Sequence, residues 1–230
     1  MYSRGRTGQT LWLALLGILV VLTVSTCGGG GQEQPKARSL PEEQQALRLG
    51  EYSSGEFKPA FSFRVGKGWT ADLEMPYALA ITQGEDILGE RKLLGFAKVE
   101  EVYKPSSTGT TTPAKAPKDI VGWFQQHPYL QTDKPEPVTV GGVKGVQFDV
   151  VVGNLPEDYY GMCGSDCVDL FRLSSEHRHV IEEEEKQRVI VLKGLKGETL
   201  TIVIASGTTE FDEFLPEAQK ILDTVTWGGS

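Results

Sequence analysis

An apolar run of fourteen residues, Leu11–Val24 (LWLALLGILVVLTV), separates a short basic N-terminus from the rest of the chain. Arg4 and Arg6 are the only charged residues before Glu33. A basic segment followed by ~7–15 apolar residues is typical of an export signal, because arginine stays in the cytoplasm while the apolar stretch enters the bilayer. The run has no polar face, which argues against a buried core helix. We therefore expect export, with the globular fold confined to the residues that follow.

Small residues lead from this run to Cys27, in the order Val24-Ser25-Thr26-Cys27. The segment resembles a bacterial lipobox, whose cysteine is diacylated with palmitate-type chains and becomes the new N-terminus. Thr26 departs from the Gly, Ala or Ser usual at its position, which leaves cleavage open. The alternative is an uncleaved signal anchor, although the run is shorter than the ~20 residues of a typical span. Either tether places residues 28–230 at the extracytoplasmic face of the cell membrane, lipid-anchored through Cys27 in the first case.

The exported part of the chain is strongly acidic. Residues 1–27 hold two of the 23 lysines and arginines and none of the 31 acids, so residues 28–230 carry a net charge of −10. Such a surface repels phosphate backbones, so we expect no nucleic-acid partner. It also disfavours a polybasic contact with anionic lipid. Solubility is the simplest explanation of the acidity.

Two of the three cysteines are left over once Cys27 is assigned to the tether. Thiols outside the cytoplasm tend to oxidise, so Cys163 and Cys167 are expected to form a disulfide. Such a small ring restricts the unfolded chain little, and its main effect is to hold a surface loop in shape. The alternative, a redox-active pair, usually has the spacing C-x-x-C near a βαβ unit.

Composition divides the chain into three parts. Residues 1–27 form the signal peptide or anchor. Residues 28–49 begin with four glycines and continue with Gln, Glu and Pro, the composition of a flexible linker. Residues 50–230 are long enough to fold as one domain with its own core.

Alternating apolar residues and turn glycines predict a sheet made of hairpins. Strands are expected over residues 61–65, 77–82, 93–103, 137–140, 146–152, 188–192 and 200–205. Two hairpins are expected, one around Gly141-Gly142 and one between Gly194 and Gly197. Residues 154–175, which include Cys163 and Cys167, are expected to form a loop.

Two helices complete the expected fold. A short helix over residues 118–127 would bury Ile120, Trp123 and Phe124. A longer one over residues 211–225 carries an apolar stripe, with Thr209 and Asp212 in a capping arrangement and a kink expected at Pro216. The sequence therefore predicts an α+β domain, a largely antiparallel sheet with helices packed on its faces.

Three segments of the chain together resemble a known group of domains. They are GEYSSGEFKPAFSFRVGKGWT, PEPVTVGGVKGVQFDV and ETLTIVIASGTTEFDEFLPEAQKILDTVTW. They are similar to uncharacterised exported and lipoprotein domains of Gram-positive-type bacteria, which also contain a cysteine loop like CGSDCVDLF. The order of elements further resembles the PsbP-like α/β sandwich of small extracytoplasmic accessory proteins. The resemblance implies a fold and a location, and it carries over no catalytic residue and no cofactor.

The sequence contains no recognisable catalytic motif. A G-x-S-x-G elbow, a phosphate loop and H-E-x-x-H are all missing. His177 and His179 would face the same side of a strand and are weak zinc candidates, because a zinc site needs about four ligands, or three and a water. The acidic run Glu182 to Glu185 is interpreted as a solvated face.

One loop has the composition of a contact surface. Asp158, Tyr159, Tyr160 and Met162 lie close to the predicted disulfide, and tyrosine and methionine are enriched in protein interfaces. The alternative is that one tyrosine packs on the core and the other covers the sheet edge.

We expect from the sequence a membrane-tethered extracytoplasmic lipoprotein with a non-enzymatic binding or accessory domain, whose partner is an envelope protein or a small ligand. No catalytic residue and no cofactor is assigned. One alternative is a hydrolase that acts on envelope material with a site the sequence does not locate. The other is a metal-capture lipoprotein that uses His177 and His179.

Overall fold

A computed structural model describes residues 37–84, 92–164, 166–195 and 197–228, all within a compact unit that spans Pro35–Ser230. The expected signal peptide, Cys27 and the first part of the expected linker lie outside the described residues. Among the described helices, none has the length and apolar character needed to cross a membrane.

The domain is β-rich, so the predicted α+β class is wrong. Strands hold 49% of the described residues and helices 10%, in two helices only. The sheets are largely antiparallel, and strands such as β4 (Phe61–Val65) and β13 (Cys167–Arg172), as well as the two helices, contribute side chains to the cores of the domain. The prediction failed because it assigned two stranded segments to the linker and to the cysteine loop.

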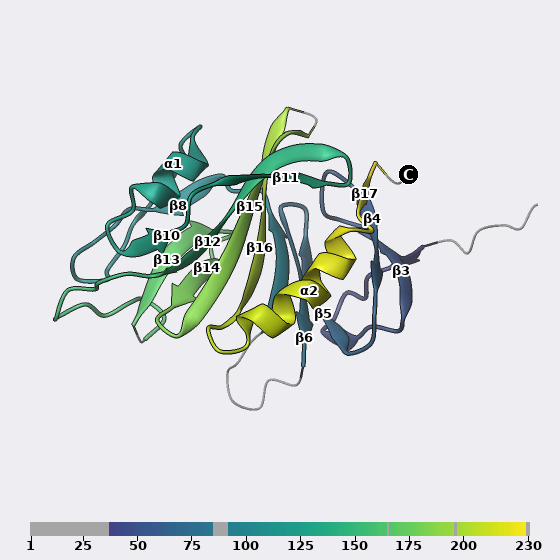
Figure 1. Ribbon diagram of the computed structural model, residues 1–230, viewed down its shortest axis with the longest axis horizontal. Helices are drawn as coiled ribbons and strands as arrows, with labels where there is room; N and C mark the ends of the chain where they lie inside the picture. The colour runs from purple at the N-terminus through teal and green to yellow at the C-terminus, as the bar shows by residue number, and fades with distance from the viewer. Residues whose placement is uncertain (1–36, 85–91, 165, 196, 229–230) are drawn as a thin grey trace, which may run out of the picture. The chain divides into compact units, whose positions relative to one another are not determined.

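A nine-stranded antiparallel sheet forms the centre of the domain (Figure 1). Its strand order is β10-β12-β15-β16-β7-β6-β5-β2, and β11 pairs with β12 beside that path. The strands are β2 (Gln45–Ala46), β5 (Trp69–Met75), β6 (Ala78–Gln83), β7 (Lys92–Ala97), β10 (Leu130–Thr132), β11 (Glu136–Val140), β12 (Val143–Val152), β15 (Glu185–Leu195) and β16 (Glu198–Gly207).

Two four-stranded sheets accompany it. The first has the order β1-β3-β4-β17 and consists of β1 (Arg38–Ser39), β3 (Gly50–Ser53), β4 (Phe61–Val65) and β17 (Thr226–Trp227). The second, here called the small sheet, has the order β14-β13-β8-β9 and consists of β8 (Glu101–Tyr103), β9 (Pro113–Lys115), β13 (Cys167–Arg172) and β14 (Arg178–Glu182). The helices are α1 (Ile120–Gln125) and α2 (Phe211–Leu222).

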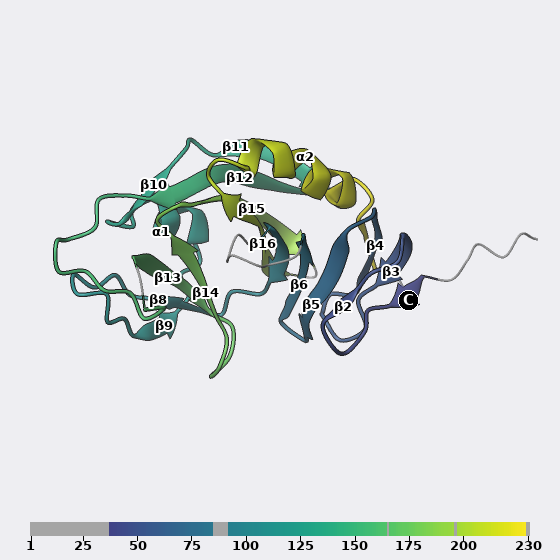
Figure 2. The same cartoon turned by 90° about the horizontal axis from the view of Figure 1, so that it is seen from below.

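Both faces of the central strands are buried, each in a different core. Ile190 and Leu192 of β15 point into one core, whereas Val189 and Val191 of the same strand point into the other. Figure 2 shows α2 and the small sheet on opposite sides of β15 and β16. Because side chains alternate along a strand, a strand covered on both faces has a continuous apolar run.

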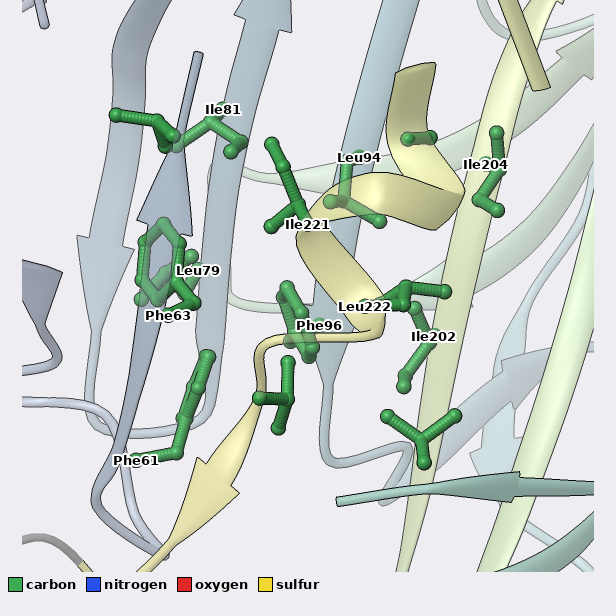
Figure 3. Close-up of a cluster of buried hydrophobic side chains, with 14 of the residues drawn as sticks. Phe61, Phe63, Leu79, Ile81, Leu94, Phe96, Ile202, Ile204, Ile221 and Leu222 are labelled. Atoms are coloured by element: carbon green, nitrogen blue, oxygen red, sulfur yellow. The ribbon is translucent and has the colours of Figure 1, made fainter. Parts of the chain in front are cut away.

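The first core lies under α2 and the β1-β3-β4-β17 sheet. Side chains from five elements meet there around Phe96, as Figure 3 shows: Phe61, Phe63, Leu79, Ile81, Leu94, Phe96, Ile202, Ile204, Ile221 and Leu222. The apolar stripe predicted for the C-terminal helix is confirmed, with Phe211, Phe214 and Ala218 also buried. The predicted cap is not, because Glu210 is the N-cap residue and makes no side-chain capping hydrogen bond.

The second core lies between the nine-stranded sheet and the small sheet. It joins residues of β12, β15 and β16 to Val168, Leu170 and Phe171 of β13. Helix α1 adds Ile120 and Phe124. Its N-cap, Asp119, accepts a hydrogen bond of 3.1 Å from the backbone N–H of Gly122.

Both predicted hairpins are present, as β11–β12 and β15–β16. Gly141 and Gly142 adopt φ values of +55° and +81° in the first turn, a conformation that favours glycine. Two segments that were expected to contain no strand do contain strands. Residues 154–175 contain β13, and residues 28–49 contain β1 and β2, with Leu40 and Leu47 buried.

We predict that Phe96→Ala lowers the free energy of unfolding by about 3–5 kcal/mol, the usual cost of removing a fully buried phenylalanine. The Phe96 ring lies 4.6 Å from the Phe61 ring and 6.5 Å from that of Trp227, so neither neighbour can fill the space without moving. Urea denaturation measures the change. Leu49→Ala is the control, because Leu49 is 60% exposed and its truncation should change stability by about 0.5 kcal/mol or less.

Candidate functional site

The disulfide expected from the sequence is present. Cys163 and Cys167 are bonded, with their Cα atoms 6.4 Å apart. Cys167 is the first residue of β13 and is fully buried. The bond therefore fixes residues 158–164 to the edge of the second core, which is the structural role expected for so short a ring.

The two tyrosines of this loop have different environments. Tyr159 is buried in the second core with its ring 5.5 Å from that of Tyr129, and burial, with the negative charge of Asp169, raises its pKa to about 12. Tyr160 is 65% exposed and Met162 is 43% exposed. Asp158 is exposed as well. The packing alternative therefore holds for Tyr159, and Asp158, Tyr160 and Met162 remain available for contact.

A second loop, residues 104–112, packs against the loop that carries Tyr160 and Met162. The backbone N–H of Tyr160 donates to the carbonyl of Thr108 over 3.4 Å. Thr111 donates from its hydroxyl to the buried Asp169 over 3.0 Å, and the same oxygen lies 3.2 Å from the sulfur of Met162. Gly109 has φ +80°, and a Cβ there would collide with the carbonyl of Tyr160. We call the exposed side chains of Tyr160 and Met162, held in this way, the loop surface.

The two candidate zinc ligands lie in different environments. His177 is exposed and shares a hydrogen bond of 3.0 Å with Ser174, whose hydroxyl also accepts backbone N–H groups in the same turn. His179 stacks on Phe171 and shares a hydrogen bond of 2.9 Å with Gln187. Across the described ranges, no three His, Cys, Asp or Glu side chains gather as a metal site would require.

A buried polar chain links β14 to β15. Gln187 is fully buried and donates to the carbonyl of Val180 over 2.8 Å and to Glu185 over 3.1 Å. Its side-chain oxygen faces His179. Burial lowers the pKa of His179, against the opposing hydrogen bond with Gln187. These contacts tie the small sheet to the nine-stranded sheet.

Glu185 does not fit the solvated face predicted for residues 182–185. Burial raises its pKa to about 7, even though hydrogen bonds from the backbone of Glu182 and from Gln187 favour its charged form. The neighbours Glu182, Glu183 and Glu184 are exposed as expected. The acidic run thus ends in one inward-facing carboxyl, which strand alternation could have indicated had the strand start been known.

Asp149 forms an ion-pair cluster on the other face of the sheet, beside a hollow of about 330 Å³. It accepts hydrogen bonds from Arg188 over 2.7 Å and 3.1 Å, and Lys186 lies 3.0 Å away. Burial would raise the pKa of Asp149, but the hydrogen bonds and charges of these two cations outweigh it and hold the pKa below its ordinary value. The cluster joins β12 to β15 and is structural.

A larger cleft opens at one end of the second core, with a volume of about 630 Å³. Thr199 and Thr201 of β16 line it on one side, and residues 99–101 and 115–118 with Ile120 line it on the other. Thr201 is fully buried, and within the described structure its hydroxyl has no hydrogen-bond partner. An unsatisfied buried hydroxyl costs about 1–3 kcal/mol. Sequence reasoning missed this cleft, since its walls come from segments a hundred residues apart.

The comparisons with known proteins show no family for this chain. No protein-family model matches the sequence. No curated protein matches it significantly. Among solved structures, LpqN of Mycobacterium tuberculosis, described as involved in cell envelope biogenesis, is 14% identical with a TM-score of 0.40, over 80% of this chain and 93% of that chain. Cyanobacterial PsbP (CyanoP) from Synechocystis sp. PCC 6803 is 12% identical with a TM-score of 0.40, over 79% of this chain and 95% of that chain. At these values neither similarity assigns a function or a site.

We predict that Glu185→Gln stabilises the domain only at neutral and alkaline pH. The pKa of Glu185 is about 7 in the folded chain against an ordinary 4.5, so its stabilising contribution is complete below pH 4.5 and is lost as the pH rises through 7. A glutamine keeps an acceptor for both hydrogen bonds without the charge. The variant should therefore equal the wild type at pH 4.5 and exceed it by about 2 kcal/mol at pH 8, a figure discounted for partial exposure.

Urea denaturation at several pH values measures this difference. Glu183→Gln makes the same change on an exposed neighbour and should show no such trend. A stability difference between Glu185→Gln and the wild type that is independent of pH would contradict the assignment.

Proposed function

We propose that this chain is a membrane-tethered extracytoplasmic binding module that contacts a partner protein of the envelope through the loop surface. One observation carries the proposal. Of the three large hydrophobic side chains that are exposed among the described residues, Leu49, Tyr160 and Met162, two lie together on the disulfide-held loop. Aromatic and methionine side chains are enriched at the centres of interfaces.

The way the loop is held supports this proposal. The disulfide, the buried Tyr159 and the contact with Thr108 restrict the loop before any partner arrives. A preorganised surface loses less conformational entropy on binding than a free loop does. Exposure of two apolar side chains on a rigid support is costly in water, and a partner that covers them removes that cost.

The location rests on two separate features. The basic N-terminus, apolar run and Cys27 favour export and lipid modification. The disulfide is the kind of bond that persists in oxidising compartments. Our proposal includes the more specific location as well, namely that the chain is a lipoprotein of a Gram-positive-type envelope, acylated at Cys27.

No contact among the described residues favours the envelope hydrolase or the metal-capture lipoprotein. His177 and His179 are engaged with Ser174 and Gln187, so metal capture has no ligand set within the described ranges. The Ser174–His177 pair has no carboxylate hydrogen-bonded to its imidazole in the described structure, and its serine is engaged in the turn. We propose no hydrolase on that basis.

We predict that Cys27→Ser removes the lipid and releases the protein from the membrane. Acylation needs the thiol, and a short apolar run alone is a weak span. Mass spectrometry of the N-terminal peptide and fractionation of membranes from the native host measure the outcome. A wild-type protein that keeps an intact N-terminus and carries no lipid at Cys27 would identify the uncleaved signal anchor in place of the lipid.

We predict that a photo-crosslinking residue at position 160 captures one discrete partner in native-host cells, and that Met162→Ser abolishes this capture. The same residue at Leu49 is the control, because that position is exposed but lies outside the loop surface. Met162→Ser should lower stability by about 1 kcal/mol or less, since the side chain is 43% exposed and belongs to neither core. Equal capture from positions 49 and 160, or capture that survives Met162→Ser, contradicts the proposed contact.

A further inference from the structure

The cleft at the end of the second core has the size of a small-molecule site. Its volume is about 630 Å³, within the range of roughly 300–1,000 Å³ that ligand pockets occupy. It lies apart from the loop surface, and none of the lining residues belongs to that surface. An inference about it therefore stands independently of the proposed partner contact.

Thr201 marks the floor of the cleft as a place for a hydrogen bond. The side chains that follow it on the same face of β16, Val203 and Ala205, are apolar and belong to the second core. A valine at position 201 would continue that face without leaving a polar group unpaired. Instead Thr201 is one of the residues that line the cleft, and its buried hydroxyl has no hydrogen-bond partner within the described structure. A bound molecule with a donor or acceptor would satisfy it.

The charges at the rim favour an anion. Lys115 and Lys118 line the cleft, and neither makes an ion pair or a side-chain hydrogen bond with any described residue. Of the two acids at the rim, Glu101 is paired with Arg172 at 3.3 Å, which leaves Glu100 as the single uncompensated one. The rim therefore carries a local positive excess on a chain whose net charge is −8.

The walls between floor and rim are apolar. Val99 and Ala116 are partly buried against the second core, and Ile120 belongs to it. Apolar walls with few, well-placed polar groups are the usual composition of a site for a small organic ligand.

We propose that this cleft binds a small organic carboxylate with an apolar body. The carboxylate lies at Lys115 and Lys118, the body lies against Val99, Ala116 and Ile120, and a polar group at the far end bonds to the hydroxyl of Thr201. Each part of this ligand answers one observed property of the cleft.

Three related probes test the three parts separately. The probe 6-hydroxy-2-naphthoate has all of them, 2-naphthoate lacks the hydroxyl, and 2-naphthol lacks the carboxylate. Calorimetric titration uses the full-length protein in lipid nanodiscs, with the heats of empty nanodiscs subtracted. We expect 6-hydroxy-2-naphthoate to bind about fivefold more tightly than 2-naphthoate and about tenfold more tightly than 2-naphthol.

Variants of this chain assign each preference to a residue. Thr201→Val should abolish the advantage of 6-hydroxy-2-naphthoate over 2-naphthoate, whereas Thr201→Ser keeps it. The melting temperature of Thr201→Val should equal or exceed that of the wild type, because the unpaired hydroxyl is gone. Lys118→Gln should weaken both naphthoates about threefold and leave 2-naphthol unchanged. Lys144→Gln changes an exposed lysine outside the cleft and should have no effect.

The proposal is overturned by any of three results. They are no measurable binding of the complete probe, equal affinities for the three probes, or preferences that Thr201→Val and Lys118→Gln leave unchanged. Should Thr201→Val fail to fold, the Lys118→Gln titration and the ranking of the three probes on the wild-type protein still decide between these outcomes.

Discussion

The β15–β16 pair is the element on which both cores depend. Val189 and Val191 face the second core while Ile190 and Leu192 face the first, and β16 alternates in the same way with Ile202 and Val203. Displacement of this hairpin would expose both faces at once. Because burial of apolar surface is the dominant stabilising contribution, α2 on one side and the small sheet on the other are stable only while these two strands hold their register.

Burial of strands on both faces also explains which parts of the fold the sequence could predict. The hairpins were recognisable because their turn glycines and flanking strands are local. The layer that covers β15 and β16 was not, since β13 reads Cys-Val-Asp-Leu-Phe-Arg and follows a loop rich in Gly, Ser and Asp. All but its last residue is buried, so it shows no alternation. Its pairing with the next strand, β14, and with the distant β8 identifies it as a strand, and the α+β prediction failed there.

The two candidate sites also differ in how far the sequence could predict them. The loop surface could be predicted from composition, because two tyrosines and a methionine beside a cysteine pair are neighbours in the chain. Composition could not say which tyrosine would be buried; the contact of Tyr159 with Tyr129 decides that. The cleft had no local signal at all. A lone threonine in a β-branched strand looks like any other strand residue, and only the fold shows that Thr201 is buried without a partner.

The small sheet connects the two proposed sites physically. Cys167 begins β13 beside the loop surface, and Arg172 ends that strand opposite Glu101 at the cleft. Strand β9 runs the same way, from the neighbourhood of Thr111 under Met162 to Lys115 at the rim. A coupling free energy between the two sites, were these short strands to carry one, would have to be the same in both directions, because linkage is reciprocal.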